Sequence, residues 1–183
     1  MIVHLHEYIE GHPVNCRWCL FQKIRRARQM GGEGRILTLI RNHYSRLAEE
    51  IIAQCRLITN NFSHEVLVTN IASNTLDVFE PILDLLDSNN ENIHIVKDIM
   101  IKLDNRNFGE NRNIPCMDRM NWIGIDENIV PDNIEEFRNV ILIDDVFDSG
   151  CSYQIAKSKL LELGVVSERI SLITILKIRP QFN

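Results

Sequence analysis

The chain has 183 residues, 45% of them hydrophobic, which favours one globular domain with a sizeable core over two independent domains. A net charge of -5, with acids and bases interspersed, argues against general nucleic-acid or anionic-membrane binding, because either needs a basic face. No apolar stretch approaches the roughly 20 residues of a membrane helix, so we expect a soluble cytoplasmic protein.

The first 35 residues contain several histidines and a Cys-x-x-Cys pair, in the stretch HLHEYIEGHPVNCRWC. Cysteine and histidine at such spacing can bind zinc tetrahedrally, and the candidate ligands are His12, Cys16 and Cys19. Alternatively, His4 and His6 form one face of a strand and the cysteines pack in a helix. The five cysteines are an odd number and do not suggest a disulfide framework, so we expect reduced thiols.

Three elements are predicted next along the chain. From Ile36 to Cys55, apolar residues recur every three or four positions, which predicts an amphipathic helix. The run Glu65–Ile71 suits a buried strand, and Leu76–Leu86 shows helical spacing in which Pro81 starts or kinks the helix.

The middle of the chain is less regular. Ile93–Ile101 is predicted to be a strand, and Trp122–Ile125 is a candidate for one more. Between them, KLDNRNFGENRNIPCMDRM is polar and patternless, which indicates a long surface loop that either moves for function or hides short strands.

The clearest unit lies near the C-terminus. It comprises a strand over Val140–Ile143, a helix from about Ser152 to Leu163 that Gly164 ends, and a strand over Ile170–Leu176. Continuous aliphatic strands are typical of a parallel sheet buried on both faces. The sequence therefore predicts an α/β fold with a central, mainly parallel sheet flanked by helices.

The first strand of this unit runs into a turn in the stretch VILIDDVFDSGCS, Val140–Ser152. Ligands of such sheets bind beyond the carboxyl ends of the strands, and the first amides of a helix attract phosphate. Gly150 permits close approach, and Ser149 and Ser152 can donate hydroxyl hydrogen bonds. Alternatively, Asp148 or Ser149 only caps the helix, which leaves the clustered acids Asp144 and Asp145 unexplained.

These thirteen residues resemble the phosphoribosyl pyrophosphate motif of type I phosphoribosyltransferases: four aliphatic residues, two acids, two variable residues and a Ser-rich turn with glycine. Asp148-Ser149-Gly150 is similar to the Asp-Thr-Gly of the 6-oxopurine branch. Lys177, in Leu176-Lys177-Ile178-Arg179-Pro180, resembles the lysine with which that branch contacts the base oxygen, or is an ordinary solvated lysine.

The resemblance implies phosphoribosyl transfer from phosphoribosyl pyrophosphate to a nucleobase, with Mg²⁺ on the pyrophosphate. Asp144 and Asp145 would contact the ribose hydroxyls and serve the metal indirectly, and Asp148 would accept the ring proton of the base. The substrate-binding candidates that the resemblance implies are Asp144, Asp145, Asp148, Ser149, Gly150, Cys151, Ser152, Thr69, Asn70 and Lys177.

Thr69 and Asn70 enter this set because the family's pyrophosphate loop follows the first core strand, although the usual Lys-Gly or Arg is missing here. The family's mobile loop would fall in the patternless stretch, whose basic residues either neutralise pyrophosphate or are simply solvated. They are Lys102, Arg106, Arg112 and Arg119.

The resemblance also implies a hood over the base. This chain ends shortly after Lys177, so the hood would come from residues 1–35, and residues 36–183 would form the phosphoribosyltransferase-like domain. The N-terminal Cys-x-x-Cys is similar to the zinc-binding segment of ComF-like homologues, which have two such pairs. Two functions stay open: an active transferase, possibly homodimeric, and a nucleotide-binding regulator or ComF-like accessory protein without turnover.

Overall fold

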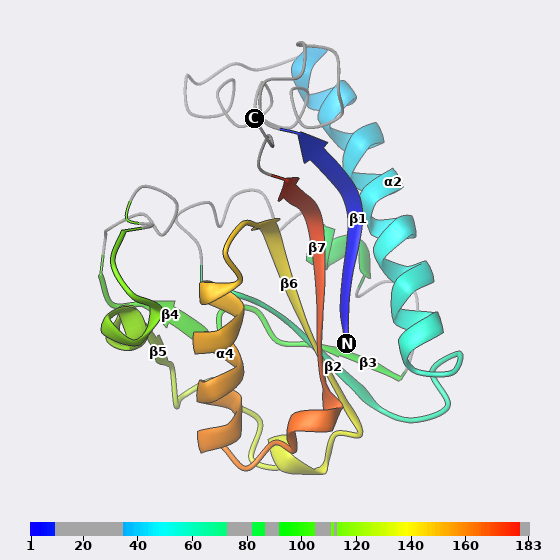
Figure 1. Cartoon of the computed structure of the whole chain (residues 1–183). Helices are drawn as coiled ribbons and strands as arrows, with labels where there is room; N and C mark the ends of the chain where they lie inside the picture. The colour runs from blue at the N-terminus through cyan, green and yellow to red at the C-terminus, as the bar shows by residue number, and fades with distance from the viewer. Residues whose placement is uncertain (10–34, 73–81, 87–91, 105–110, 112, 180–183) are drawn as a thin grey trace.

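The computed structural model describes residues 1–9, 35–72, 82–86, 92–104, 111 and 113–179 (Figure 1). Helical residues 82–86 join the named elements, which are β1 (Ile2–Ile9), α2 (Arg35–Ile58), β2 (Val66–Asn70), β3 (Ile93–Ile95), β4 (Met100–Lys102), η1 (Cys116–Trp122), β5 (Ile123–Ile125), η2 (Ile134–Glu136), β6 (Asn139–Phe147), α4 (Cys151–Glu162), η3 (Ser167–Arg169) and β7 (Ile170–Arg179). Among the described helices, none combines the length and the apolar character needed to cross a bilayer.

A five-stranded sheet forms the centre of the molecule, in the order β1-β7-β6-β2-β3, and every neighbouring pair is parallel. The predicted α/β class and parallel sheet are confirmed. Side chains alternate along β6, so Ile141 and Ile143 join the hydrophobic cluster that contains α2, whereas Val140 and Leu142 join the cluster that contains α4. The helices therefore cover opposite faces of the sheet (Figure 1).

The predicted helix over Ile36–Cys55 is confirmed as α2, which continues to Ile58. Leu47, Ala48, Ile51 and Cys55 are buried at helical spacing and pack on the sheet. Burial also raises the pKa of the Cys55 thiol to about 12. Cys55 is therefore an unreactive core residue.

The β6-α4-β7 crossover is confirmed, and Gly164 follows the end of α4 with a left-handed φ of 88°. Both strands run further than predicted, to Phe147 and to Arg179. Neighbouring strands explain the difference, because β7 pairs with β1 and β6 along its polar end as well as its aliphatic start. The local change from aliphatic to polar residues does not end these strands.

The prediction of one strand over Ile93–Ile101 is wrong. The segment forms β3, which pairs with β2, and β4, which pairs with β5 in a separate antiparallel sheet. Asp98 lies between them with a φ of 59°, a left-handed conformation that cannot continue a strand. The predicted loop after β4 contains η1, and the strand expected at Trp122–Ile125 is β5.

Residues 2–9 belong to the central sheet, because they form the edge strand β1, which pairs with β7. Residues 2–9 of the predicted N-terminal segment therefore pair with a strand of the predicted domain over residues 36–183. Residues 10–34, including the zinc candidates His12, Cys16 and Cys19, lie outside the described residues, as do residues 76–81 of the helix predicted at Leu76–Leu86. Residues 82–86 of that helix are helical.

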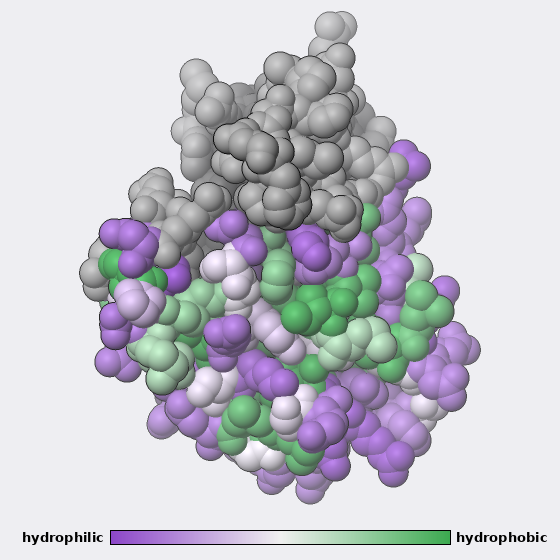
Figure 2. Space-filling model, viewed as in Figure 1, coloured by the Kyte–Doolittle hydropathy of each residue, from purple (hydrophilic) through white to green (hydrophobic). Residues whose placement is uncertain are grey.

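The described part of the surface is mixed in character. On the face drawn in Figure 2, hydrophilic residues surround smaller hydrophobic areas. Large exposed apolar side chains occur in separate elements, with Leu57 in α2, Leu103 after β4 and Met117 in η1. Scattered apolar residues of this kind are normal on a folded protein.

Candidate functional site

The acids of the VILIDDVFDSGCS stretch lie at the carboxyl end of β6, where ligands bind in open parallel sheets. Asp144 and Asp145 are part of the strand rather than of the turn that was expected to follow Ile143. The strand ends at Phe147, a turn of three residues follows, and α4 begins at Cys151 (Figure 1). The structure thus places the predicted turn between a strand end and a helix start.

Gly150 is the residue on which this turn depends. Its φ is 77°, and a Cβ atom at this position would lie 2.9 Å from Cζ of Phe147. The Phe147 ring in turn contacts the His4 ring of β1, with centroids 4.8 Å apart. Only glycine fits this backbone conformation and this close approach without strain. The Phe147 ring thus lies between Gly150 and the His4 ring.

The first turn of α4 has amides that can receive an anion. The amide of Gln154 donates to the carbonyl of Gly150 at 3.0 Å, so the amides of Ser152 and Tyr153 precede the first intrahelical bond. They lie at the positive end of the helix dipole. Asp148 and Ser152 are half-buried and Ser149 is exposed, whereas Gly150 and Cys151 are buried. An anion can therefore approach from the side of Ser149 and Ser152.

The alternative role of capping is fulfilled in part by Ser149. Its hydroxyl oxygen accepts a hydrogen bond from the amide of Cys151 at 3.4 Å, which is long for such a bond. Gly150, at the N-cap position itself, has no side chain with which to cap the helix. Capping by Ser149 thus leaves the two following amides of α4 to other acceptors.

Asp144 joins the strand to the helix. Its side chain is 7% exposed; Oδ1 accepts from the Asp145 amide at 2.9 Å, and Oδ2 accepts from the Ser152 hydroxyl at 3.2 Å. Burial raises the pKa of the Asp144 carboxyl well above its usual range, and the charge of Asp145 adds to the rise. Asp144 therefore fixes the first turn of α4, whereas half-buried Asp145 is the more accessible acid.

Asp144→Asn is expected to flatten the pH dependence of folding stability. Because the pKa of Asp144 is raised in the folded state, the folded chain keeps a proton that the unfolded chain has released. The free energy of unfolding therefore falls as pH rises from the ordinary carboxyl range towards the folded pKa. Urea unfolding between about pH 4 and about pH 8 measures the slope. Parallel curves for the variant and the unmodified chain would contradict the assignment, and the exposed Asp132→Asn provides the control.

On β7, Thr174 and Lys177 extend the site. Thr174 pairs in register with Asp144 and with His4, whose Nδ1 lies 2.7 Å from the Thr174 hydroxyl. Lys177 is the register partner of Phe147, so it lies one strand away from the residue before Asp148. Sequence reasoning missed Thr174 and the part played by His4. The alternation of His4 and His6 was the available signal for a strand there.

Thr69 and Asn70, the candidates for the pyrophosphate loop, end β2 beside β6. Both side chains are enclosed, with exposures of 0% and 1%. The Thr69 hydroxyl has no hydrogen-bond partner among the described residues, and the Asn70 carboxamide bonds to Asp98. The structure thus places both residues at the same edge of the sheet as Asp144, with their side chains enclosed by the protein.

Cys151 forms a disulfide with Cys116, 35 residues earlier, and the two Cα atoms are 5.5 Å apart. This corrects the expectation that these thiols are reduced. The pairing has no sequence motif, because it depends on η1 packing against the start of α4. It fixes the first residue of η1 beside the candidate anion site.

The basic residues expected to act from the mobile loop are only partly described. Arg119, in η1, is 3% exposed and lies over the Trp122 ring, 5.9 Å from its centroid. Lys102 ends β4, while Arg106 and Arg112 are outside the described residues. Within the described ranges, no three histidine, cysteine or acidic side chains gather as a metal site would require.

Comparison with known proteins adds little to this geometry. No family model and no curated protein sequence matches the chain. Among solved structures, the chain is similar to a hypoxanthine phosphoribosyltransferase from Staphylococcus aureus, with a TM-score of 0.44 and 15% identity over 77% of this chain and 75% of that one. A likeness this weak does not establish a shared family.

Proposed function

We propose that this chain is a Mg²⁺-dependent phosphoribosyltransferase that moves the 5-phosphoribosyl group from phosphoribosyl pyrophosphate to a nucleobase. One observation supports the proposal most strongly. The stretch that resembles the family motif spans the end of β6 and the start of α4, at the sheet edge where ligands of α/β proteins bind. Its turn contains a left-handed Gly150 and leads to helix amides suited to phosphate.

The exposure of each residue suggests which part of the substrate it would contact. The 5'-phosphate would bind the amides of the first turn of α4 and the hydroxyl of Ser149, since the Ser152 hydroxyl already donates to Asp144. Asp145 would contact the ribose hydroxyls. Buried Asp144 would act mainly by holding Ser152, with which it is hydrogen-bonded. The sequence motif implies the same contact with the ribose hydroxyls for Asp144 and Asp145. We propose different roles instead, because Asp144 is buried and Asp145 is half-buried.

The proposed reaction is a displacement at the anomeric carbon. The bond from that carbon to the pyrophosphate oxygen breaks, a bond to a ring nitrogen of the base forms, and Asp148 accepts the ring proton. Mg²⁺ fits the donor set, since it needs only one or two carboxylates beside phosphate oxygens, and Asp145 is the more accessible carboxylate here. When bound, the metal would neutralise charge on the leaving pyrophosphate.

A 6-oxopurine is the proposed acceptor class. The support is the Asp148-Ser149-Gly150 sequence and the position of Lys177, which lies across from Phe147 and so near the turn. A lysine ammonium there can donate a hydrogen bond to an exocyclic oxygen of the base.

A regulator that binds the same ligand without turnover is the second candidate. The enclosed side chains of Thr69 and Asn70 favour it, because they offer a leaving pyrophosphate no cation and no exposed hydroxyl.

Pyrophosphate release distinguishes the candidates. The protein would be incubated with Mg²⁺, phosphoribosyl pyrophosphate and a panel of purine and pyrimidine bases, and ligand binding would be measured separately by calorimetry. The enzyme proposal predicts release that requires one class of base, with 6-oxopurines the best acceptors. Binding of phosphoribosyl pyrophosphate without release in the presence of any base would favour the regulator.

A further inference from the structure

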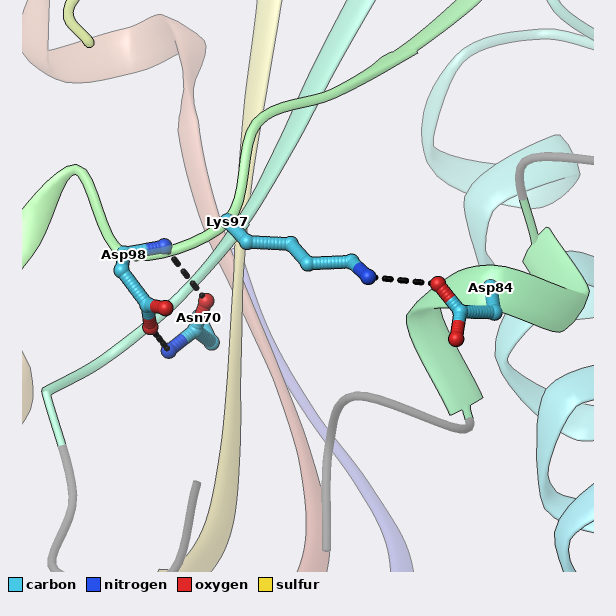
Figure 3. A network of polar contacts seen from close by, with 4 residues as sticks. All are labelled: Asn70, Asp84, Lys97 and Asp98. Carbon is cyan, nitrogen blue, oxygen red and sulfur yellow. Dashed lines mark hydrogen bonds and ion pairs between the residues drawn. The ribbon is translucent and has the colours of Figure 1, made fainter. Parts of the chain in front are cut away.

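The end of β2 is held by a reciprocal pair of hydrogen bonds between Asn70 and Asp98 (Figure 3). Nδ2 of Asn70 donates to Oδ1 of Asp98 at 3.0 Å, and the backbone amide of Asp98 donates to Oδ1 of Asn70, also at 3.0 Å. The two residues are 28 positions apart in the chain. The Asn70 carboxamide thus uses its oxygen and its nitrogen on one partner.

Asp98 needs this support because its backbone is in the left-handed region, with a φ of 59°. Such a conformation is unfavourable for most residues other than glycine, and it persists where surrounding contacts fix it. Asp98 lies between β3 and β4, where the chain leaves the main sheet. The contact with Asn70 therefore joins this turn to the end of β2.

The pair lies at the same sheet edge as the candidate phosphate site. Asn70 is the register partner of Ile143 in β6, the residue before Asp144, and the amide of Ile71 donates to the Ile143 carbonyl at 2.9 Å. The chain therefore leaves β2 between two fixed points, β6 on one side and the Asp98 turn on the other.

We propose that the Asn70–Asp98 pair is a positioning device that sets the course of the backbone after β2, at Ala72, for binding the pyrophosphate part of the substrate, because the Ile71 amide is already bonded to Ile143. The inference depends on the proposed transferase or regulator function. Asn70 was expected to bind the substrate directly. Under this inference its side chain instead positions the backbone and does not contact the ligand. A cation is not required at this position if main-chain groups receive the anion.

The neighbouring ion pair provides a matched control. Lys97 precedes Asp98 and its ammonium contacts the carboxylate of Asp84, in helical residues 82–86 (Figure 3). The Lys97 and Asp84 side chains are 36% and 61% exposed. Exposed ion pairs contribute little to stability, so Asp84→Asn should leave the Asn70–Asp98 contact intact.

The test measures Mg²⁺-pyrophosphate and ribose 5-phosphate separately by calorimetry, on the full chain. Asn70→Asp places a carboxylate against Asp98 and should weaken pyrophosphate binding about tenfold, with ribose 5-phosphate binding unchanged. Adding Asp98→Asn should restore it, since the new carboxylate can accept from the backbone amide at position 98 and from the new carboxamide. Asp84→Asn should change neither affinity.

Asp98→Gly is the second variant if Asn70→Asp does not fold. Glycine adopts the positive φ without strain, and its missing carboxylate should also weaken pyrophosphate binding selectively. An unmodified chain that binds neither ligand would overturn the proposed function and this inference together. If the unmodified chain binds both ligands, unchanged pyrophosphate affinity in Asn70→Asp would overturn this inference alone. If Asn70→Asp does not fold, unchanged pyrophosphate affinity in Asp98→Gly would do the same. A folded double variant that does not recover would also overturn it.

Discussion

Asp148→Asn is expected to reduce turnover in the pyrophosphate-release assay by about 10²- to 10⁴-fold, the usual contribution of a general base. The asparagine amide has nearly the size of the carboxylate and still forms hydrogen bonds, but it cannot accept the ring proton of the base. Asp148 begins the turn and is half-buried, so the substitution does not disturb the core. Calorimetry should therefore show ligand binding close to that of the unmodified chain.

The matched control for this prediction is Asp132→Asn, which removes an exposed carboxylate outside the turn. It should leave turnover unchanged. Normal turnover in Asp148→Asn would remove Asp148 from the mechanism, and an equal loss in both variants would show that the loss is not specific to Asp148.

Cys116→Ser is expected to lower the free energy of unfolding by about 3 to 4 kcal/mol under non-reducing conditions. The disulfide to Cys151 closes a loop with a sequence separation of 35, and closing a loop of that size restricts the unfolded chain by about this amount. Urea unfolding with and without a reductant measures the effect. The reductant should bring the unmodified chain down to the stability of the variant.

A non-reducing peptide map should show the peptides of Cys116 and Cys151 linked. Equal stability of the unmodified chain with and without reductant would contradict the contribution of this disulfide. In any compartment that keeps thiols reduced, the reduced form would be the relevant one for activity. Comparing turnover in both redox states then shows whether η1 must be fixed beside the anion site.

The elements that the sequence predicts well are those whose signal is local. Helix α2 follows from apolar residues at helical spacing, and the crossover follows from two aliphatic runs with Gly164 between them. The turn between β6 and α4 is predictable for the same reason, since Gly150 and its neighbouring serines are adjacent in the chain. The alternation of His4 and His6 likewise indicated the strand that the structure shows as β1.

The features that could not be predicted depend on partners far away in the chain. The break at Asp98 is stabilised by Asn70, and the bond between Cys116 and Cys151 depends on how η1 packs. The burial of Asp144 follows from β6 continuing past its aliphatic run beside β7. Asp144 and Asp145 are therefore equivalent acids in the sequence pattern but differ in burial in the fold, because side chains alternate along a strand.

Phosphate binding at the start of α4 can be tested by an NMR titration of the isotope-labelled chain with ribose 5-phosphate, which follows individual backbone amides. We expect saturable shifts concentrated at Gly150, Ser152 and Tyr153, and a loss of affinity in Gly150→Ala because a Cβ would meet the Phe147 ring. Absence of shifts at these amides, at ligand concentrations that saturate binding elsewhere, would contradict the placement of the phosphate at the start of α4.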